Sequence, residues 1–128
     1  MPKKQFRENL PAGFSPASPP NKYHNRKVEI DGLKFDSMWE ARRWQELRLL
    51  ESAGVIRDLQ RQVRFEVIPK TETERACFYV ADFVYAEGSC LVIEDAKSPA
   101  TRANREYINK RKAVKWRYPQ YEFREIVK

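Results

Sequence analysis

The hydrophobic pattern of the chain changes its period several times, and each change marks a predicted element. From Ala41 onward, apolar residues recur every three or four positions, which is the spacing of a helix with one buried face. Ser37 and Glu40 stand three residues apart at the start of that run, as in a capping box, and Gly54 supplies a C-terminal stop. The pattern therefore predicts a helix from about residue 38 to 53.

Other segments show strand patterns, either strict alternation or a continuous apolar run bounded by turn residues. Ahead of the first helix, Asp31-Gly32 lies between apolar residues and predicts a β-hairpin with a type I′ turn. After the third strand, Ser98-Pro99 is a favourable N-cap and first-turn pair that opens a basic helix over about 99–118. The predicted strands cover 62–68, 76–86, 91–97 and 121–127. The expected fold is α/β, in the order hairpin, helix, three strands, helix, strand.

The turn between the second and third strands determines how they pair. Glu87-Gly88-Ser89-Cys90 matches a two-residue type II′ turn. Counting back from that turn along an antiparallel ladder places Asp82 directly opposite Asp95. A three-residue turn would shift the register by one residue and spoil this alignment. Lys97 lies two residues beyond Asp95, on the same face of its strand.

Two carboxylates that face each other in an apolar sheet repel each other, so a positive charge is expected between them. A hard divalent cation such as Mg²⁺ is the simplest candidate, with Asp82 and Asp95 as its ligands. Glu40 points toward the core side of its helix and is expected to complete the cluster, while Lys97 holds or activates a water. Glu94 faces the other side of its strand and is the second choice for a ligand. Each residue alone also fits an ordinary structural role, and only their combination favours a catalytic site.

The composition narrows the class of partner. Lysine and arginine number 25 against 18 aspartates and glutamates, a net charge of +7, and the pI is about 9.5. Clustered cations attract phosphate backbones, which makes nucleic acid the expected partner, although a merely soluble basic surface would carry the same charge. The sequence contains no long apolar run, so we expect no membrane-spanning segment.

Residues 1–22 are rich in proline and poor in apolar residues, and we expect them to form a disordered arm. The remaining chain, 23–128, has the length of one domain with a single core. With one histidine and no Cys-x-x-Cys spacing, we expect no structural zinc site. The N-terminus lacks the apolar stretch of a secretory signal, which favours the cytoplasm of the cell that expresses the protein.

The acidic residues and their order along the chain carry a resemblance. Helix-borne Glu40, Ala81-Asp82-Phe83 and Glu94-Asp95-Ala96-Lys97 resemble the PD-(D/E)XK nuclease superfamily, whose pattern is an acid on the first helix, an Asp on the second strand and an acid-x-Lys on the third. Here Asp95 stands where Glu is common. Over residues 22–127, further motifs are similar to an uncharacterised family of bacteriophage and prophage proteins. These motifs are Asp31-Gly32-x-Lys34-Phe35-Asp36-Ser37, Glu40-Ala41, Leu59-x-x-Gln62 and Tyr79-Val80-Ala81-Asp82-Phe83.

This resemblance implies a single-domain restriction-endonuclease-like core that hydrolyses DNA phosphodiester bonds with Mg²⁺ or Mn²⁺. Asp82, Asp95 and Glu40, together with the Ala96 carbonyl, would hold the metal, and Lys97 would position the water. Similarity to junction-resolving phage endonucleases suggests branched, Holliday-junction-like DNA as the substrate, during phage replication or recombination in a bacterial host cell. The superfamily also contains members that do not cleave, so a non-catalytic nucleic-acid-binding protein is the alternative.

The expected DNA contacts lie mainly on the second helix. Its cations begin directly after Lys97 and would flank the site, so we favour DNA contact over a merely solvated face. Gln62 lies at the start of the first strand, where related nucleases often place a polar residue near the scissile phosphate, although a surface glutamine is the commoner interpretation. The three tryptophans, Trp39, Trp44 and Trp116, are expected to pack in the core or between helices. The expected DNA-binding residues are Gln62, Arg102, Arg105, Lys110, Arg111, Lys112 and Lys115.

Because one small domain offers one active site for two DNA strands, we also predict a homodimer with two-fold symmetry.

Overall fold

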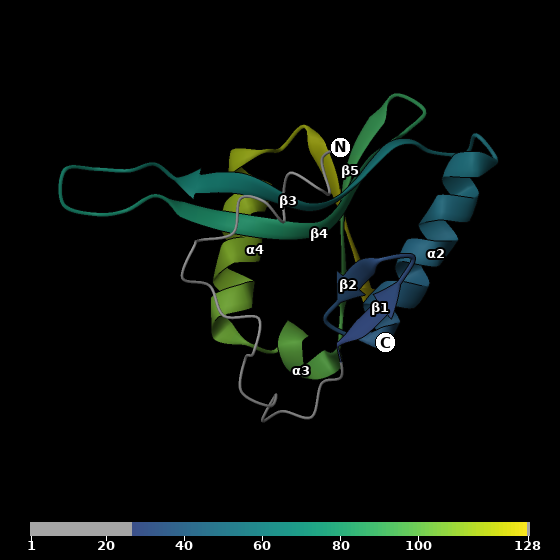
Figure 1. Cartoon of the computed structure of the whole chain (residues 1–128). Coiled ribbons are helices and arrows are strands. Elements are labelled where there is room, and N and C mark those ends of the chain that lie inside the picture. The colour runs from purple at the N-terminus through teal and green to yellow at the C-terminus, as the bar shows by residue number, and fades with distance from the viewer. Residues whose placement is uncertain (1–26, 128) are drawn as a thin grey trace.

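The computed structural model describes residues 27–127 of the 128-residue chain. Within this range the chain forms a short hairpin and a four-stranded sheet with helices on both sides (Figure 1). The arm predicted for residues 1–22 lies outside the described residues. The elements are β1 (Val28–Ile30), β2 (Leu33–Phe35), α2 (Met38–Ser52), β3 (Arg57–Ile68), β4 (Cys77–Glu87), β5 (Cys90–Lys97), α3 (Pro99–Arg102), α4 (Arg105–Arg117) and β6 (Tyr121–Val127).

The local signals at the N-terminal end produce the structure that they predict. Asp31 and Gly32 both take positive φ angles, 54° and 77°, as a type I′ turn requires. The Ser37 hydroxyl accepts the Glu40 N–H at 3.1 Å and caps α2. The Glu40 carboxylate does not complete a capping box at Ser37, because its Oε1 accepts the Asp36 N–H at 3.4 Å. The predicted capping box is therefore only half formed: Ser37 caps α2, but Glu40 does not bond back to Ser37.

The sheet has the strand order β3-β4-β5-β6, antiparallel up to β5, with β6 parallel to β5. The predicted two-residue turn is present: Glu87 pairs with Cys90, and Gly88 has a φ of 60°. Helices α3 and α4 form the crossover that a parallel β5–β6 pair needs. No helix in residues 27–127 is long and apolar enough to cross a membrane.

Two predicted elements differ from the structure. Strand β3 begins at Arg57, five residues before the predicted start at 62, and its polar first half shows no hydrophobic alternation. The helix predicted over 99–118 is two helices. The Asn104 side chain accepts the Tyr107 N–H at 3.1 Å and caps α4, and an Asn that bonds the backbone in this way interrupts a helix.

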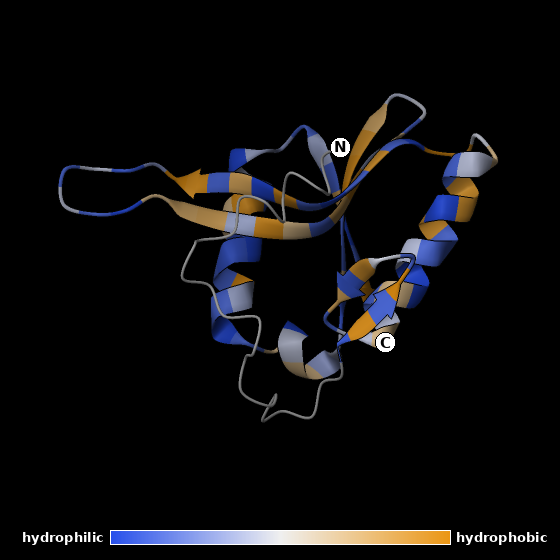
Figure 2. Cartoon of the chain, viewed as in Figure 1, coloured by the Kyte–Doolittle hydropathy of each residue, from blue (hydrophilic) through white to orange (hydrophobic). Residues whose placement is uncertain are grey.

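The sheet separates two hydrophobic clusters. On the α2 side, Trp44 and Leu47 pack against the central strands, and on the α4 side Val114 does so. Figure 2 shows hydrophobic and hydrophilic positions interleaved along α2 and α4, as helices with one buried face require. Because each cluster uses one face of the same sheet, a residue's cluster tells which way its side chain points.

By this criterion, the side chains of β3 and β4 switch from one face of the sheet to the other at one point along each strand. Phe83 packs in the α2-side cluster but Ala81 in the α4-side cluster, although alternate residues of a regular strand share a face. On β3, Val63 packs with the α4-side cluster, whereas the Arg61 guanidinium lies on the α2 side, 4.4 Å from the Phe35 ring centroid. The sheet is therefore irregular between these residues, and the candidate site lies there.

Candidate active site

The irregularity of the sheet is located at Gln62 and Asp82. Arg61 pairs with Phe83 and the ladder resumes at Val63, so Gln62 lies across from Asp82 without forming a regular pair. Gln62 has a φ of 56°, a left-handed conformation that few residues other than glycine adopt. The prediction that Gln62 begins the strand is wrong, since it lies inside β3 and beside a candidate catalytic acid.

The ladder between β4 and β5 ends at Phe83–Glu94, one residue before the predicted Asp82–Asp95 pair. The predicted register is confirmed, but here carboxylates replace the ladder bonds. Asp95 Oδ1 accepts the Asp82 N–H at 2.8 Å, and Asp82 Oδ2 accepts the Ala96 N–H at 2.9 Å. Each acid thus satisfies a buried backbone donor of the opposite strand. These two hydrogen bonds hold the carboxylates of Asp82 and Asp95 next to each other at the point where the regular β4–β5 ladder ends, a break in the sheet.

Lys97 joins these acids at the end of β5. Its Nζ lies 3.1 Å from Asp82 Oδ2, and it also stands 5.6 Å from the Tyr107 ring centroid on α4. Burial lowers the pKa of Lys97, but the charges of Asp82 and Asp95 outweigh burial and raise it above its ordinary value. The side chain is therefore a cation held within an acid cluster.

Glu40 reaches the same cluster from α2. It is buried, and burial together with the neighbouring Asp82 carboxylate raises its pKa from 4.5 to about 8. Asp95 is fully buried, and burial raises its pKa to about 6 despite the opposing charge of Lys97. Asp95 Oδ2 has no hydrogen-bond partner among the described residues. A buried carboxylate oxygen without a donor is a place for a proton or a cation.

Arg61 is a site residue that the sequence analysis missed. Burial lowers its pKa, while the charges of Glu40, Asp82 and Asp36 act in the opposite direction, which places its guanidinium near these acids. Its Nη2 donates to the Lys34 carbonyl at 2.8 Å, and its Nε is buried without a partner in residues 27–127. No signal marked it, because it precedes the alternating part of β3.

Four predicted catalytic residues thus come together from α2, β4 and β5: Glu40, Asp82, Asp95 and Lys97. No three His, Cys, Asp or Glu side chains in the described part of the chain are arranged as a preformed metal site. What the geometry offers is a buried acid cluster with one lysine inside it and one arginine beside it. Such a cluster can bind a cation, exchange protons near neutral pH and hold a polar substrate group.

Comparison with known proteins gives one match. Residues 20–128 match the model of a family described as a protein of unknown function (DUF1064). The chain belongs to this family. No curated protein and no solved structure matches it.

In this DUF1064 protein, the second-choice ligand Glu94 has a structural role instead. Its side chain is fully buried and takes two hydrogen bonds from Arg43, Nε to Oε2 at 2.5 Å and Nη2 to Oε1 at 3.0 Å. The Tyr85 hydroxyl also donates to it at 2.6 Å. All of these contacts lie on the α2 side of the sheet, so Glu94 is not available to the cluster around Asp95.

The six helical cations predicted to contact DNA divide into two groups in the structure. Arg102 and Arg111 bind the Glu125 carboxylate of β6, at 2.7 and 3.2 Å, and Lys110 lies 3.4 Å from Glu106. The other helical cations have no carboxylate partner within the described residues. These are Arg105, Lys112 and Lys115.

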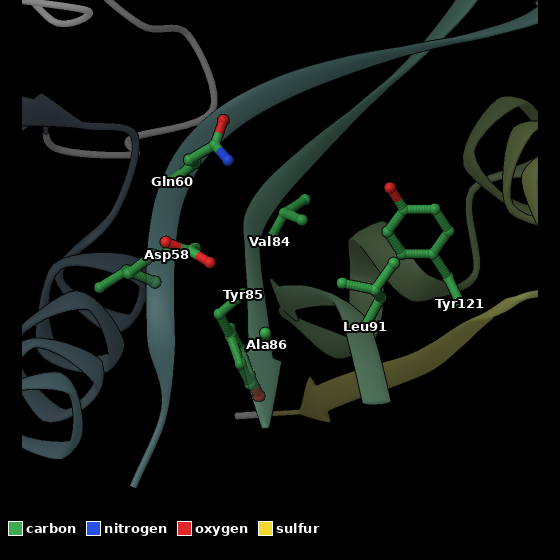
Figure 3. Close-up of a pocket in the computed structure, with 8 residues that line it drawn as sticks. Asp58, Gln60, Val84, Tyr85, Ala86, Leu91 and Tyr121 are labelled. Atoms are coloured by element: carbon green, nitrogen blue, oxygen red, sulfur yellow. The ribbon is translucent and has the colours of Figure 1, made fainter. Parts of the chain in front are cut away.

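A shallow hollow of about 380 Å³ opens elsewhere on this DUF1064 chain, where β3, β4, β5 and β6 meet (Figure 3). Figure 3 shows Asp58 and Gln60 on β3 at one side and Leu91 and Tyr121 at the other, with Val84 between them. It contains none of the four candidate catalytic residues. We therefore place the candidate chemistry at the acid cluster and not in this hollow.

Proposed function

We propose that this DUF1064 protein is a metal-dependent DNA endonuclease with a restriction-endonuclease-like core. The observation that carries the proposal is the arrangement of Asp82 and Asp95. Their two buried carboxylates accept backbone N–H groups in place of ladder hydrogen bonds, beside Lys97 and Glu40. An acidic break in an otherwise apolar sheet costs stability, which a purely structural sheet would avoid by placing apolar residues there. Catalysis is a reason to retain it.

The donor chemistry fits Mg²⁺ or Mn²⁺. Both ions prefer carboxylate and carbonyl oxygens, and Asp95 Oδ2 is a buried oxygen that lacks a partner in the described residues. Asp82 and Asp95 would hold the ion, with Glu40 supporting them. Mg²⁺ is commonly bound by one or two carboxylates and completed by water and substrate phosphate, so a preformed site of three acids is not required. A bound ion would polarise the scissile phosphate and lower the pKa of a coordinated water.

The chain's own side chains then have separate tasks. Lys97 remains a cation because the Asp82 and Asp95 carboxylates raise its pKa. Its ammonium group orients the attacking water or stabilises the charge that develops on the phosphate. Without a metal, burial and the Asp82 carboxylate raise the pKa of Glu40 to about 8, so Glu40 is protonated at neutral pH, and a bound cation would favour its ionised form. Arg61 offsets the charge of the acids at the edge of the cluster.

The alternative is a nucleic-acid-binding protein of the same fold that does not cleave. Two observations favour it: Lys97 already lies 3.1 Å from Asp82 Oδ2, and no three His, Cys, Asp or Glu side chains in residues 27–127 form a group that could hold a metal ion. A structural ion pair would look the same. Activity measurements separate the two functions.

The test is a cleavage assay on linear, supercoiled, nicked and four-way DNA with Mg²⁺, Mn²⁺ or EDTA. The wild type should cleave with either ion and not with EDTA. Asp82→Asn, Asp95→Asn and Lys97→Met should each lower the rate by a factor on the order of 10² or more. Asn is used because it keeps an acceptor for the buried N–H that each acid binds.

Asp58→Asn is the matched control, because Asp58 is an exposed acid of β3 outside the cluster. It should cleave at the wild-type rate. Calorimetry with Mn²⁺ should show lost metal binding for Asp82→Asn and retained binding for Lys97→Met. No cleavage by a folded wild type on any of these substrates would favour the non-cleaving alternative. Equal cleavage by all four variants would contradict the acid cluster as the active site.

A further inference from the structure

The side of α4 opposite the buried Val114 carries an exposed tryptophan. Trp116 is 81% exposed, so the expectation that it packs in the core or between helices is wrong. The other two tryptophans do pack: Trp44 is buried on α2, and the Trp39 indole N–H donates to the Ile126 carbonyl at 3.2 Å. A large aromatic ring in water loses the benefit of burial, so its exposure indicates a partner.

Trp116 belongs to a stripe along one face of α4. Arg105, Asn109, Lys112 and Trp116 follow at intervals of four, three and four residues, which places them on one side of a helix. All four are exposed, whereas Val114 on the opposite side is fully buried. The stripe therefore presents two cations, an amide and an indole ring to solvent.

The two flanks of this stripe are neutralised within the chain. On one flank Lys110 lies 3.4 Å from Glu106, and on the other Arg111 lies 3.2 Å from Glu125. Arg105 and Lys112 have no such partner in residues 27–127. Of the three α4 cations without a carboxylate partner in the described residues, Arg105 and Lys112 thus lie on the same stripe as Trp116, and Lys115 lies beside it.

We propose that this stripe binds an unpaired strand of DNA, with a base stacked on Trp116 and phosphates at Arg105 and Lys112. The combination fits a single strand because each base offers a ring face and each linkage a negative charge, and base–aromatic stacking is independent of sequence. A duplex fits less well, since its bases already stack on one another. The neighbours of Trp116 on the stripe are charged or polar, so a dry protein interface is not favoured.

This inference rests on the proposed function, and it names the substrate class: DNA with a single-stranded part, such as a splayed arm or a branch. Tyr107, nine residues before Trp116, has its ring 5.6 Å from Lys97 Nζ. Nine residues of helix span on the order of 13 Å, so the stacked base is several nucleotides from the scissile phosphate. The stripe therefore recognises the substrate and does not contact the reacting atoms.

Tryptophan fluorescence tests the inference without cleavage. The full-length protein is titrated with an oligothymidylate and, separately, with a blunt duplex, both in EDTA. The oligothymidylate should quench the exposed, red-shifted emission of the wild type, and Trp116→Phe should show little quenching. Anisotropy with labelled oligothymidylate should give at least roughly 5-fold weaker binding for Trp116→Ala and near-wild-type binding for Trp116→Phe, which keeps a ring for stacking.

Leu49→Ala is the control, because Leu49 is 72% exposed on α2, far from the stripe in sequence. It should bind the oligothymidylate as the wild type does. Wild-type affinity of Trp116→Ala for the oligothymidylate would overturn the inference. A second pair of results would also overturn the inference. In it, the wild type is a dimer whose emission oligothymidylate does not quench, and Trp116→Ala is a monomer in light scattering. Trp116 would then lie in a protein interface.

The two proposals fail separately. Quenching and weakened binding without any cleavage would support the stripe and contradict the endonuclease. Cleavage that depends on Asp82 but not on Trp116, together with unquenched emission, would support the endonuclease and contradict the stripe.

Discussion

Two carboxylates of the acid cluster, Glu40 and Asp95, have too little contact with water to ionise as free acids do. Glu40 and Asp95 are both buried, and burial is the largest cause of the rise in their pKa values to about 8 and about 6. Lys97 provides the compensating charge at 3.1 Å from Asp82. Removing the lysine alone would leave acids that repel one another, which is the penalty of breaking a buried ion pair.

Glu40 should make the metal-free protein less stable as the pH rises. Its folded-state pKa of about 8 lies above its ordinary value of 4.5, so the protonated form stabilises the fold below pH 4.5 and this stability is lost as the pH rises toward 8. Glu40→Gln mimics the protonated acid. In EDTA, urea denaturation at pH 5 and pH 8 should show a fall for the wild type that is larger by ~1 kcal/mol or more than for Glu40→Gln.

Asp95 acts in the same direction between 3.8 and about 6, so the variant should keep part of the pH dependence. Glu29→Gln, in the exposed part of the hairpin, is the matched control and should behave as the wild type does. An unchanged pH dependence in Glu40→Gln would show that Glu40 is ionised in the fold.

The left-handed backbone at Gln62 gives a second prediction at this scale. Gln62 and Asp58 both have positive φ angles on β3, 56° and 58°, and glycine adopts this conformation without steric cost. Gln62→Gly and Asp58→Gly should each raise the free energy of unfolding by up to ~1 kcal/mol. Only Gln62→Gly should slow DNA cleavage, because Gln62 lies across from Asp82. Equal cleavage by both variants would exclude a role for the Gln62 side chain.

Helix α2 is attached to the sheet by a buried charge as well as by apolar packing. Arg43 binds Glu94 through two hydrogen bonds, and Tyr85 adds a third. Burial and the bond to Glu94 raise the pKa of the Tyr85 hydroxyl to about 12, so this phenol is a hydrogen-bond donor at neutral pH. The network holds α2 against the sheet and so helps to position Glu40 at the acid cluster.

Arg43→Met should therefore destabilise the protein by about 3 kcal/mol or more, because it leaves the Glu94 charge buried without its partner. The double variant Arg43→Met/Glu94→Leu should recover part of that loss, since both charges are then absent. Arg42→Met is the control, because Arg42 is the exposed neighbour on the same helix. Urea denaturation measures all three, and a small effect of Arg43→Met would show that water reaches Glu94.

Local signals predicted the elements whose causes are local. The Ser37 cap, the Asp31-Gly32 turn and the Gly88 turn all act within four residues, and the last of these gave the register that aligns Asp82 with Asp95. The polar half of β3 was missed because tertiary pairing with β4, and not its own pattern, makes it a strand. Arg61 lies in that half.

The break at Asn104 and the reversal of faces at Asp82 were missed for a related reason. Basic residues lie on both sides of Ala103 and Asn104, at Arg102 and Arg105, so the pattern gives no sign that the Asn104 side chain caps a new helix. The reversal depends on contacts among three strands, which no single segment records. That Glu40, Asp82, Asp95 and Lys97 lie together could be predicted from the Gly88 turn and from the face of α2 that carries Glu40, while their catalytic role stays a prediction.

At the scale of the whole molecule, the chain has a net charge of +7, and many of its cations follow β5. Some of these cations are paired within the chain and others are not. Arg102, Arg111 and the Tyr107 hydroxyl all bind Glu125 on β6, and Glu125 pairs in register with Asp95. These cations hold α3 and α4 against the sheet next to the acid cluster. They are therefore part of the scaffold, and Arg105, Lys112 and Lys115 remain as the candidates for phosphate contact.

Salt dependence of DNA binding should separate these two groups. Each phosphate contact releases condensed counterions, so losing one contact reduces the slope of log affinity against log salt by about 0.7 on single strands and about 0.9 on duplex DNA. Arg105→Gln and Lys112→Gln should each show this reduction with no loss of stability. Arg111→Gln should instead lower the free energy of unfolding by ~1 kcal/mol, because it removes a partly buried ion pair with Glu125, and should change the slope little.

Anisotropy over 50–300 mM salt in EDTA measures the slope, with splayed-arm, four-way and linear duplex DNA compared under one set of conditions. The splayed-arm and four-way DNA should bind more tightly than the linear duplex. Light scattering of the same complexes tests the predicted homodimer, since two sites would be needed to cut both strands of a branch. A slope that falls equally for Arg111→Gln and Lys112→Gln would show that Arg111 leaves Glu125 when DNA binds. The Glu125 ion pairs would then be exchanged for phosphate contacts at the edge of the acid cluster.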